Sequence, residues 1–409
     1  MILGRIADQP VEPLSRGPSA PLPERLPELD LSFGVDPRVC DRAVHLLDKL
    51  RRSEMLPFGS ESRVASVTGG SYGILEISDL KNPFKGPWVM SQMRAWGGTT
   101  VAGSAAGAVP GNLALRIIDN DRAKPLSKNA ILLAGLFALD SNTWELDRPH
   151  VFAPAASIFA RLENPGGAGT GAYVSFLGEV VLGNAITAAE VREAIGLGIY
   201  PTAAWRSGVW TNSVLLPLLL SDEPVCATAE GEALRWELRA RVGMLRWKLA
   251  TAQVRPQALM GYVQNVPASS SRPFQIATLR NDSGFPVLLN KVVFGTVSAD
   301  AASAVGSVFS NISINMFLTG GAQEDRYMTW RRILLPTLVD RSTNTWMFER
   351  PVLVRPDEAF KVEALEGGIN ATTDVYVGFQ GFVAEGLSVD EARECASLGL
   401  FSAWRRSGD

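Results

Sequence analysis

The stretch NTWELDRP at residues 142–149 decides how this sequence is understood, because NTWMFERP returns at residues 344–351. The two stretches lie 202 residues apart. Asp147 is exchanged for Glu349, while the Arg-Pro that follows is unchanged. A single Trp-Asp-Arg cluster would suggest an active site, but a repeated cluster with exchanged acids suits a structural charge better. We therefore interpret the stretch as a framework turn of a duplicated domain.

The similarity between the two halves extends well beyond this stretch. Three further pairs match in the same order: YVSFLG (173–178) with YVGFQG (376–381), ITAAEVREAIGLGIY (186–200) with LSVDEARECASLGLF (387–401), and LEISDLKN (75–82) with FQIATLRN (274–281). The offset drifts only from 199 to 203 residues, so the insertions are small, as expected of surface loops. We interpret this pattern as an internal duplication.

The duplication predicts four segments. Residues 1–61 form an arm, which begins with a Pro-rich extended part and continues as an amphipathic helix. A first β-sandwich follows at 62–210, then a linker with a basic amphipathic helix at 211–261, and then a second, homologous β-sandwich at 262–409. The Pro-rich part of the arm favours extended backbone and cannot form a core of its own.

Each copy is predicted to be mainly β. Stretches such as NLALRIID and NISINMFL alternate apolar and polar residues, the pattern of a strand with one buried face. Turn signals separate seven or eight such strands per copy, the spacing of a sandwich or barrel. The fold class is therefore mainly β, with two tandem, homologous domains of the sandwich or barrel type.

A short helix is predicted after the last strand of each copy. Thr187 and Glu190 form a capping-box pattern, in which each side chain satisfies a free N–H at the helix start, and Ser388 and Glu391 repeat it. Gly198 and Gly399 suit the helix ends.

The helix in the linker leaves two interpretations open. Leu234, Leu238, Val242, Leu245 and Leu249 form an apolar stripe, and the opposite face carries Arg235, Arg239, Arg241, Arg246 and Lys248. Such a basic helix can lie on a membrane or bind an acidic partner. The favoured alternative is an apolar face packed on the neighbouring domain and a charged face in water.

The repeated residues are those that pack, clamp and turn a sandwich. The predicted structural framework consists of Trp144, Arg148, Pro149, Gly178, Glu190, Trp205, Trp346, Arg350, Pro351, Gly381, Glu391 and Trp404. We expect Arg148 and Arg350 to stack on the nearby Trp by a cation–π contact rather than to bind a ligand.

The sequence offers little catalytic chemistry. Two histidines, His45 and His150, have no Cys or His neighbour at metal-ligand spacing, and three cysteines lie far apart, which predicts buried free thiols. The Gly-rich NPGGAGTG lacks the Lys-Ser/Thr and the helix of a P-loop. We therefore expect no catalytic, cofactor-binding or metal site and no small-molecule substrate.

Composition excludes further classes. The net charge is −3 with both signs mixed, which argues against sequence-specific nucleic-acid binding. No apolar run is long enough for a transmembrane helix, and no secretory signal is visible, so synthesis and assembly in a cytosol are expected.

The plan of two homologous β-sandwiches behind an extended arm resembles the double jelly-roll capsid proteins of tectivirus-like and related viruses. The resemblance implies that the two copies are tandem, jelly-roll-like, eight-stranded β-sandwiches that stand side by side. It further implies a homo-oligomer such as a trimer. It also implies contacts of the arm with other virion proteins or an internal membrane, and a location in the virion, for instance of a bacteriophage. One departure is that the obvious helix here follows the last strand, whereas the family inserts helices between late strands.

Two other classes stay open. A tandem carbohydrate-binding or adhesin-like protein, such as a spike or tail attachment protein, would use exposed aromatics to stack on sugars. An enzyme on a sandwich scaffold is disfavoured by the poor content of histidine and metal ligands. Oligomeric state separates a capsid protein from the carbohydrate binder, and tightly bound metal would favour the enzyme.

Overall fold

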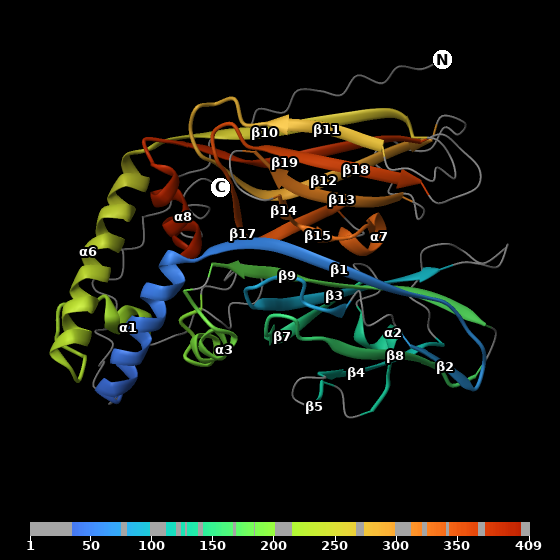
Figure 1. Ribbon diagram of the computed structural model, residues 1–409, viewed down its shortest axis with the longest axis horizontal. Coiled ribbons are helices and arrows are strands. Elements are labelled where there is room, and N and C mark those ends of the chain that lie inside the picture. Colours follow the sequence, from blue (N-terminus) through green and yellow to red (C-terminus); the bar gives the residue numbers. More distant parts are fainter. Residues whose placement is uncertain are drawn as a thin grey trace, which may run out of the picture. The chain divides into compact units, whose positions relative to one another are not determined.

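The protein is mainly β, with two β-sandwiches in tandem (Figure 1). The structure is a computed structural model. It describes residues 35–74, 80–98, 112–119, 124–126, 129–137, 142–166, 169–183, 185–200, 215–266, 274–298, 312–320, 325–340, 343–366 and 373–401. The Pro-rich part of the arm, residues 1–34, lies outside these ranges.

The first sandwich has two facing sheets. One sheet has the order β1-β9-β3-β7, made of β1 (Glu54–Val67), β9 (Thr170–Leu182), β3 (Trp88–Gly98) and β7 (Thr143–Phe152). The other has the order β2-β8-β4-β5, with β6 also paired to β4, made of β2 (Ser71–Ile74), β8 (Ile158–Asn164), β4 (Ala114–Asp119), β5 (Lys124–Pro125) and β6 (Ile131–Leu132).

The second sandwich repeats this order. Its first sheet is β10-β19-β12-β17, made of β10 (Gln253–Val266), β19 (Thr373–Glu385), β12 (Val287–Ser298) and β17 (Thr345–Val354). Its second sheet is β11-β18-β13-β14, with β16 also paired to β13, made of β11 (Phe274–Arg280), β18 (Ala359–Glu366), β13 (Ile312–Thr319), β14 (Arg326–Tyr327) and β16 (Ile333–Leu334).

Both sandwiches are wound as jelly rolls. The strands of each half can be numbered one to eight along the chain if the two short strands that pair with β4 (β5 and β6), or with β13 (β14 and β16), together count as the fifth strand. The two sheets of each half then have the orders 1-8-3-6 and 2-7-4-5. The pairs 1·8, 2·7, 3·6 and 4·5 are those of one long hairpin rolled upon itself, the arrangement of a double-sheet jelly roll. The predicted jelly-roll-like fold is confirmed in both halves.

The helices lie before, between and after the strands. They are α1 (Pro37–Arg52), α2 (Leu133–Leu136), α3 (Ala188–Gly196), α5 (Leu215–Leu219), α6 (Ala229–Thr251), α7 (Leu335–Leu338) and α8 (Val389–Ser397). Both predicted capping boxes are present at the starts of α3 and α8. Gly198 and Gly399 follow these helices with φ of 68° and 66°, the left-handed conformation that ends a helix at low steric cost.

The interpretation of NTWELDRP as a turn is correct only for its first residue. Asn142 and Asn344 have φ of 55° and 53°, a left-handed conformation that Asn tolerates. The residues after them form strands β7 and β17. Each strand loses register with its neighbour around the Arg-Pro pair. The repeated stretch is therefore an irregular strand entered through an Asn turn.

Gly178 and Gly381 lie opposite matched bulges. The register of β3 against β9 shifts between Met90 and Gln92, and that of β12 against β19 shifts at the same place in the second half. A Cβ on Gly178 would overlap the carbonyl oxygen of Val89, and one on Gly381 would overlap that of Leu288. Only glycine fits where the bulged strand approaches this closely.

The helices α1 and α6 lead directly into β1 and β10, so the predicted boundaries at residues 62 and 262 fall inside these two strands. Leu46, Lys49 and Leu50 of α1 recur as Leu245, Lys248 and Leu249 of α6, each 199 residues later. The repeated unit thus includes the helix that precedes each sandwich, which the sequence analysis had assigned to the arm and the linker.

Candidate functional site: the contact between the two sandwiches

The first strand of the first sandwich is the centre of the contact. One edge of β1 pairs with β9, and the other edge pairs in parallel with β15 (Thr329–Trp330) of the second half, through Gly59 and Ser60. The helical turn α7 lies beside β1 in Figure 1. A Cβ on Gly59 would lie 2.9 Å from Cδ1 of Ile333, so the absence of a side chain lets the second half approach.

A carboxylate anchors this approach. Glu61 of β1 accepts a hydrogen bond from the backbone N–H of Leu334 at 2.9 Å and another from the Thr337 hydroxyl, and Ser175 lies at 3.4 Å. Withdrawal of the carboxylate from water raises the pKa of Glu61 to about 7, although these hydrogen bonds act in the opposite direction.

Arg350 reaches across the contact from β17. It is 3% exposed, and its Nη2 lies 3.1 Å from Oε1 of Glu179 on β9. The hydroxyl of Tyr200 donates to the same Oε1 at 2.6 Å. Burial raises the pKa of Glu179, while the charge of Arg350 and the Tyr200 hydroxyl oppose the rise. A buried arginine is thus held against an acid of the other half.

The predicted stacking of Arg350 on Trp is wrong. Its guanidinium lies 4.6 Å from the ring centroid of Tyr200, because its acidic partner draws it toward the first sandwich. Arg148, its counterpart in the first half, is exposed on β7. The same residue of the repeat therefore has two different environments.

A charged network closes one side of the contact. The carboxylate of Glu54, at the start of β1, forms ion pairs with Arg326 and with Arg355, whose Nη2 lies 2.9 Å away. Arg326 in turn pairs with Glu358 at 2.7 Å. On the other side, the Ser91 hydroxyl donates to Glu349 at 2.6 Å. The buried contact is thus polar as well as apolar.

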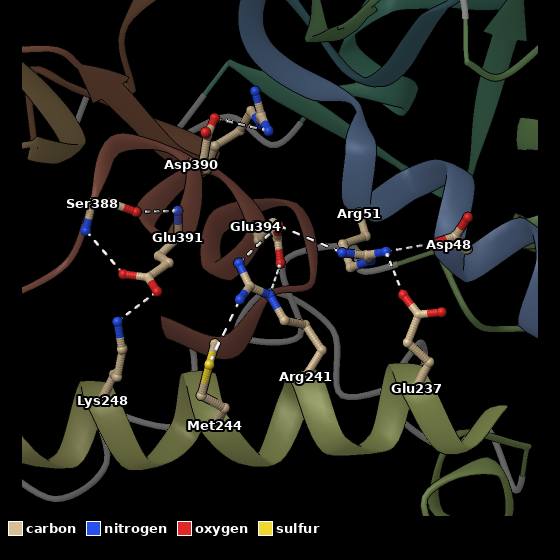
Figure 2. Close-up of polar contacts among 11 residues, drawn as sticks. Asp48, Arg51, Glu237, Arg241, Met244, Lys248, Ser388, Asp390, Glu391 and Glu394 are labelled. Atoms are coloured by element: carbon tan, nitrogen blue, oxygen red, sulfur yellow. Dashed lines mark hydrogen bonds and ion pairs between the residues drawn. The ribbon is translucent and has the colours of Figure 1, made fainter. Parts of the chain in front are cut away.

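A second set of ion pairs joins the helices (Figure 2). Lys248 of α6 lies 2.6 Å from Glu391 of α8, and Arg241 lies 2.7 Å from Glu394. Burial alone would raise the pKa of Glu391, but Lys248 and the backbone N–H of Ser388 lower it below its ordinary value. The capping-box acid therefore has two tasks, since it closes the helix start and binds the neighbouring helix.

The same pairs occur in the first half. Lys49 of α1 lies 2.6 Å from Glu190 of α3, and Arg42 lies 2.8 Å from Glu193. Arg51 links α1 to the second set, since it contacts Glu394 of α8 at 3.5 Å; Figure 2 shows this pair. Both capping acids of the predicted framework thus lie in one layer of helices.

The favoured interpretation of α6 needs a correction. Its apolar residues Leu238, Val242, Leu245 and Leu249 are buried, as expected, whereas Leu234 is only half-buried. Its basic face is not simply in water. Arg235 is fully buried, and its Nε donates to Glu232 at 2.8 Å, while Arg239 pairs with Asp222. Trp236 and Trp247 are exposed at 44% and 64%.

The remaining framework residues have these places. Trp144 is half-buried with its ring against Phe137, and Trp346 is 2% exposed with its ring against Phe348. Pro149 and Pro351 lie in β7 and β17. Trp205 and Trp404 lie outside the described residues. The common framework role of the set stays a prediction.

The ranges that the structure describes contain no group of three or more His, Cys, Asp or Glu arranged to hold a metal ion. His150 contacts Asp119 at 2.9 Å. Cys40 and Cys395 are buried and Cys226 is half-buried, and all three are free thiols. Within the same ranges, no helix has the length and apolar character needed to span a membrane.

No protein-family model and no curated protein matches the sequence. Several solved structures are similar to it. A chain in the atomic structure of Sulfolobus Turreted Icosahedral Virus is 12% identical, covers 87% of this chain and 98% of its own, and has a TM-score of 0.25. A chain in the structure of infectious bursal disease virus, Gx strain, is 10% identical, with coverages of 83% and 74% and a TM-score of 0.22.

The CBM22-1–CBM22-2 tandem domain of Xyn10C from Paenibacillus barcinonensis is also similar, at 10% identity, coverages of 82% and 94% and a TM-score of 0.16. Superpositions this loose identify neither a family nor a function.

Sequence reasoning missed the acids of the contact, although a signal for them existed. Glu61 is matched by Met260, Glu179 by Phe382 and Tyr200 by Phe401. At these three positions the first copy has a polar side chain and the second copy has an apolar one. These positions mark the surface by which one copy meets the other.

Proposed function

We propose that the protein is a non-enzymatic structural protein of a virion, a capsid protein that assembles through protein–protein interfaces into a viral shell. The observation that carries the proposal is the jelly-roll strand order of both halves, joined by a buried contact. Double-sheet jelly rolls serve viral capsids, lectins and cupins. A rigid block of two similar domains suits a shell, because it can repeat nearly equivalent contacts.

The proposed partners follow from this role. The chain associates with itself, as a homo-oligomer such as a trimer, and with other virion proteins. It is made in the host cytoplasm and located in the virion, with a bacteriophage as the proposed virus class. A peripheral contact with an internal membrane has weaker support. Arg235, Arg239, Arg241 and Lys248 are paired within the chain, and Arg246 is the one exposed residue among the five basic residues of the predicted face.

Negative-stain images of the purified full chain test the proposal. We expect trimers or closed shells. Monodisperse monomers that bind a glycan array would contradict it and favour the carbohydrate-binding alternative, for which the exposed Tyr72 and Trp247 are the available stacking surfaces.

A further inference from the structure

One segment of the repeat is fully buried in the second half and partly exposed in the first. Residues 333–338 (ILLPTL) are buried throughout, with Ile333 at 0% and Leu334 at 4% exposure. The matching residues 131–136 (ILLAGL) have the same secondary structure, β6 and α2, yet Ile131 is 39% and Leu132 is 46% exposed. Ala134 and Gly135 are exposed as well.

The difference is caused by the contact between the sandwiches. Ile333 and Leu338 lie over Gly59 of β1, Leu334 and Thr337 bind Glu61, and the Leu338 carbonyl accepts a hydrogen bond from Arg94. In the first half, β6 pairs with β4 alone among the described strands, and Ile131 and Leu132 stay exposed. Its copy of the segment therefore lacks the partner that buries the second copy.

The surface that would receive this segment is also exposed. Gly59 is matched by Ala258 on β10 and Leu177 by Gln380 on β19, and both counterparts are exposed. In the first half, β1 is flanked by β9 and β15, whereas β10 pairs with β19 alone among the described strands. Gly378, beside them on β19, has open space where a Cβ would be.

We propose that these two surfaces bind each other between copies of this chain. The donor surface consists of Ile131, Leu132, Ala134, Gly135 and Leu136; the acceptor surface consists of Pro256, Ala258, Gly378 and Gln380. The donor surface of one chain packs on the acceptor surface of the next, as residues 333–338 pack on β1 within the chain. The inference rests on the proposed capsid function and specifies its self-contact.

The chemistry of the two surfaces fits this occupant. An exposed isoleucine and leucine lose apolar area to water on docking, which favours association. Ala258 has a Cβ where Gly59 has none, so the donor segment lies somewhat farther from β10 than residues 333–338 lie from β1. Gly378 has no side chain and open space at its Cβ position, which leaves room for the docked segment. Met260 and Phe382 replace the acids Glu61 and Glu179, so this contact needs no buried carboxylate.

The contact joins two different surfaces, so it is head-to-tail. Such contacts form a ring when the rotation between copies closes and a filament when it does not. Each chain then has one donor and one acceptor surface, and blocking either surface stops growth. This property gives the test.

The experiment uses three full-length variants, Leu132→Asp on the donor, Ala258→Arg on the acceptor and Ile74→Asp as a control. Ile74 is 49% exposed on β2 and belongs to neither surface. Analytical ultracentrifugation measures assembly, and circular dichroism confirms that each variant is folded. We expect the first two variants to be monomers, with association weakened at least tenfold, and the control to assemble as the wild type does.

Mixing the two monomeric variants is the decisive step. One still has an acceptor and the other a donor, so we expect a dimer of one copy of each that grows no further. Variants that assemble normally, or monomers that stay monomers on mixing, would overturn the head-to-tail contact while wild-type assembly still supported a capsid role. A wild-type chain that remains monomeric would contradict both proposals.

Discussion

At the scale of single residues, the two copies of one arginine show how position in the fold sets its role. Arg350 is 3% exposed and faces Glu179, whereas Arg148 is exposed. A buried ion pair contributes modestly as a pair, but removing one member leaves the other charge buried without a partner.

Replacing Arg350 by alanine should therefore destabilise the chain by about 3–5 kcal/mol. Arg148→Ala is the matched control, since it removes the same residue of the repeat from a solvated site, and we expect a change within about 0.5 kcal/mol. Urea unfolding of both variants measures the difference. Equal losses would show that the buried pair does not hold the two halves.

Glu61 makes stability depend on pH. Its pKa is raised from 4.5 to about 7 in the folded chain. Below about pH 4.5 the group is protonated in both the folded and unfolded states, and its contribution to stability is then complete. As the pH rises to about 7 the unfolded chain releases its proton first, so this contribution is lost, at about 3 kcal/mol for the full shift.

The test compares the unfolding free energy of wild type and Glu61→Gln from pH 4 to 8. The difference in unfolding free energy between the two proteins should change by about 3 kcal/mol over this interval, because the wild type becomes less stable relative to the variant as the pH rises. Glu145→Gln, at an exposed position of β7, serves as the control. A difference that is flat with pH would contradict a raised pKa at Glu61.

At the scale of elements, the strands were predictable and their irregularities were not. Period-two alternation predicted β4 and β13, and the capping boxes predicted the starts of α3 and α8. The sequence also marked Gly178 and Gly381 as repeated, but not why glycine is needed. The reason is a bulge in a neighbouring strand, which depends on register across the sheet.

Gly381→Ala and Gly178→Ala should each destabilise the protein by about 3 kcal/mol or more, because the new methyl group would overlap a backbone oxygen. Gly378→Ala lies on the same strand as Gly381 and has open space at its Cβ, so we expect little change. Thermal unfolding of the three variants measures the effect. A tolerated Gly381→Ala would mean that the bulge can move.

At the scale of the whole molecule, the contact between the sandwiches should make them unfold together. Thr337 is fully buried in this contact, and Gly135, its counterpart in the repeat, is exposed. An arginine in place of Thr337 must separate the two sandwiches, because the site is filled by the contact. An arginine in place of Gly135 projects into water in a single chain.

We expect calorimetry to show one transition for the wild type and for Gly135→Arg, and two transitions or a lowered melting temperature for Thr337→Arg. Gly135→Arg should instead impair assembly between chains, because it lies on the donor surface. A Thr337→Arg variant that melts as the wild type does would show that the two sandwiches are not coupled through α7.

By itself, the sequence determined that one β domain is present twice, that each copy ends in a capped helix, and where most strands lie. These features are local or are repeated in the residues themselves, so they can be found without coordinates. Only the tertiary structure decided that Arg350 is buried while Arg148 is exposed, that Ile333 is covered while Ile131 is not, and that Glu61 and Glu179 face the other half. The physical reason is that burial and charge pairing depend on residues more than a hundred positions apart, so segments of similar sequence, such as 131–136 and 333–338, are exposed or buried according to what packs against them.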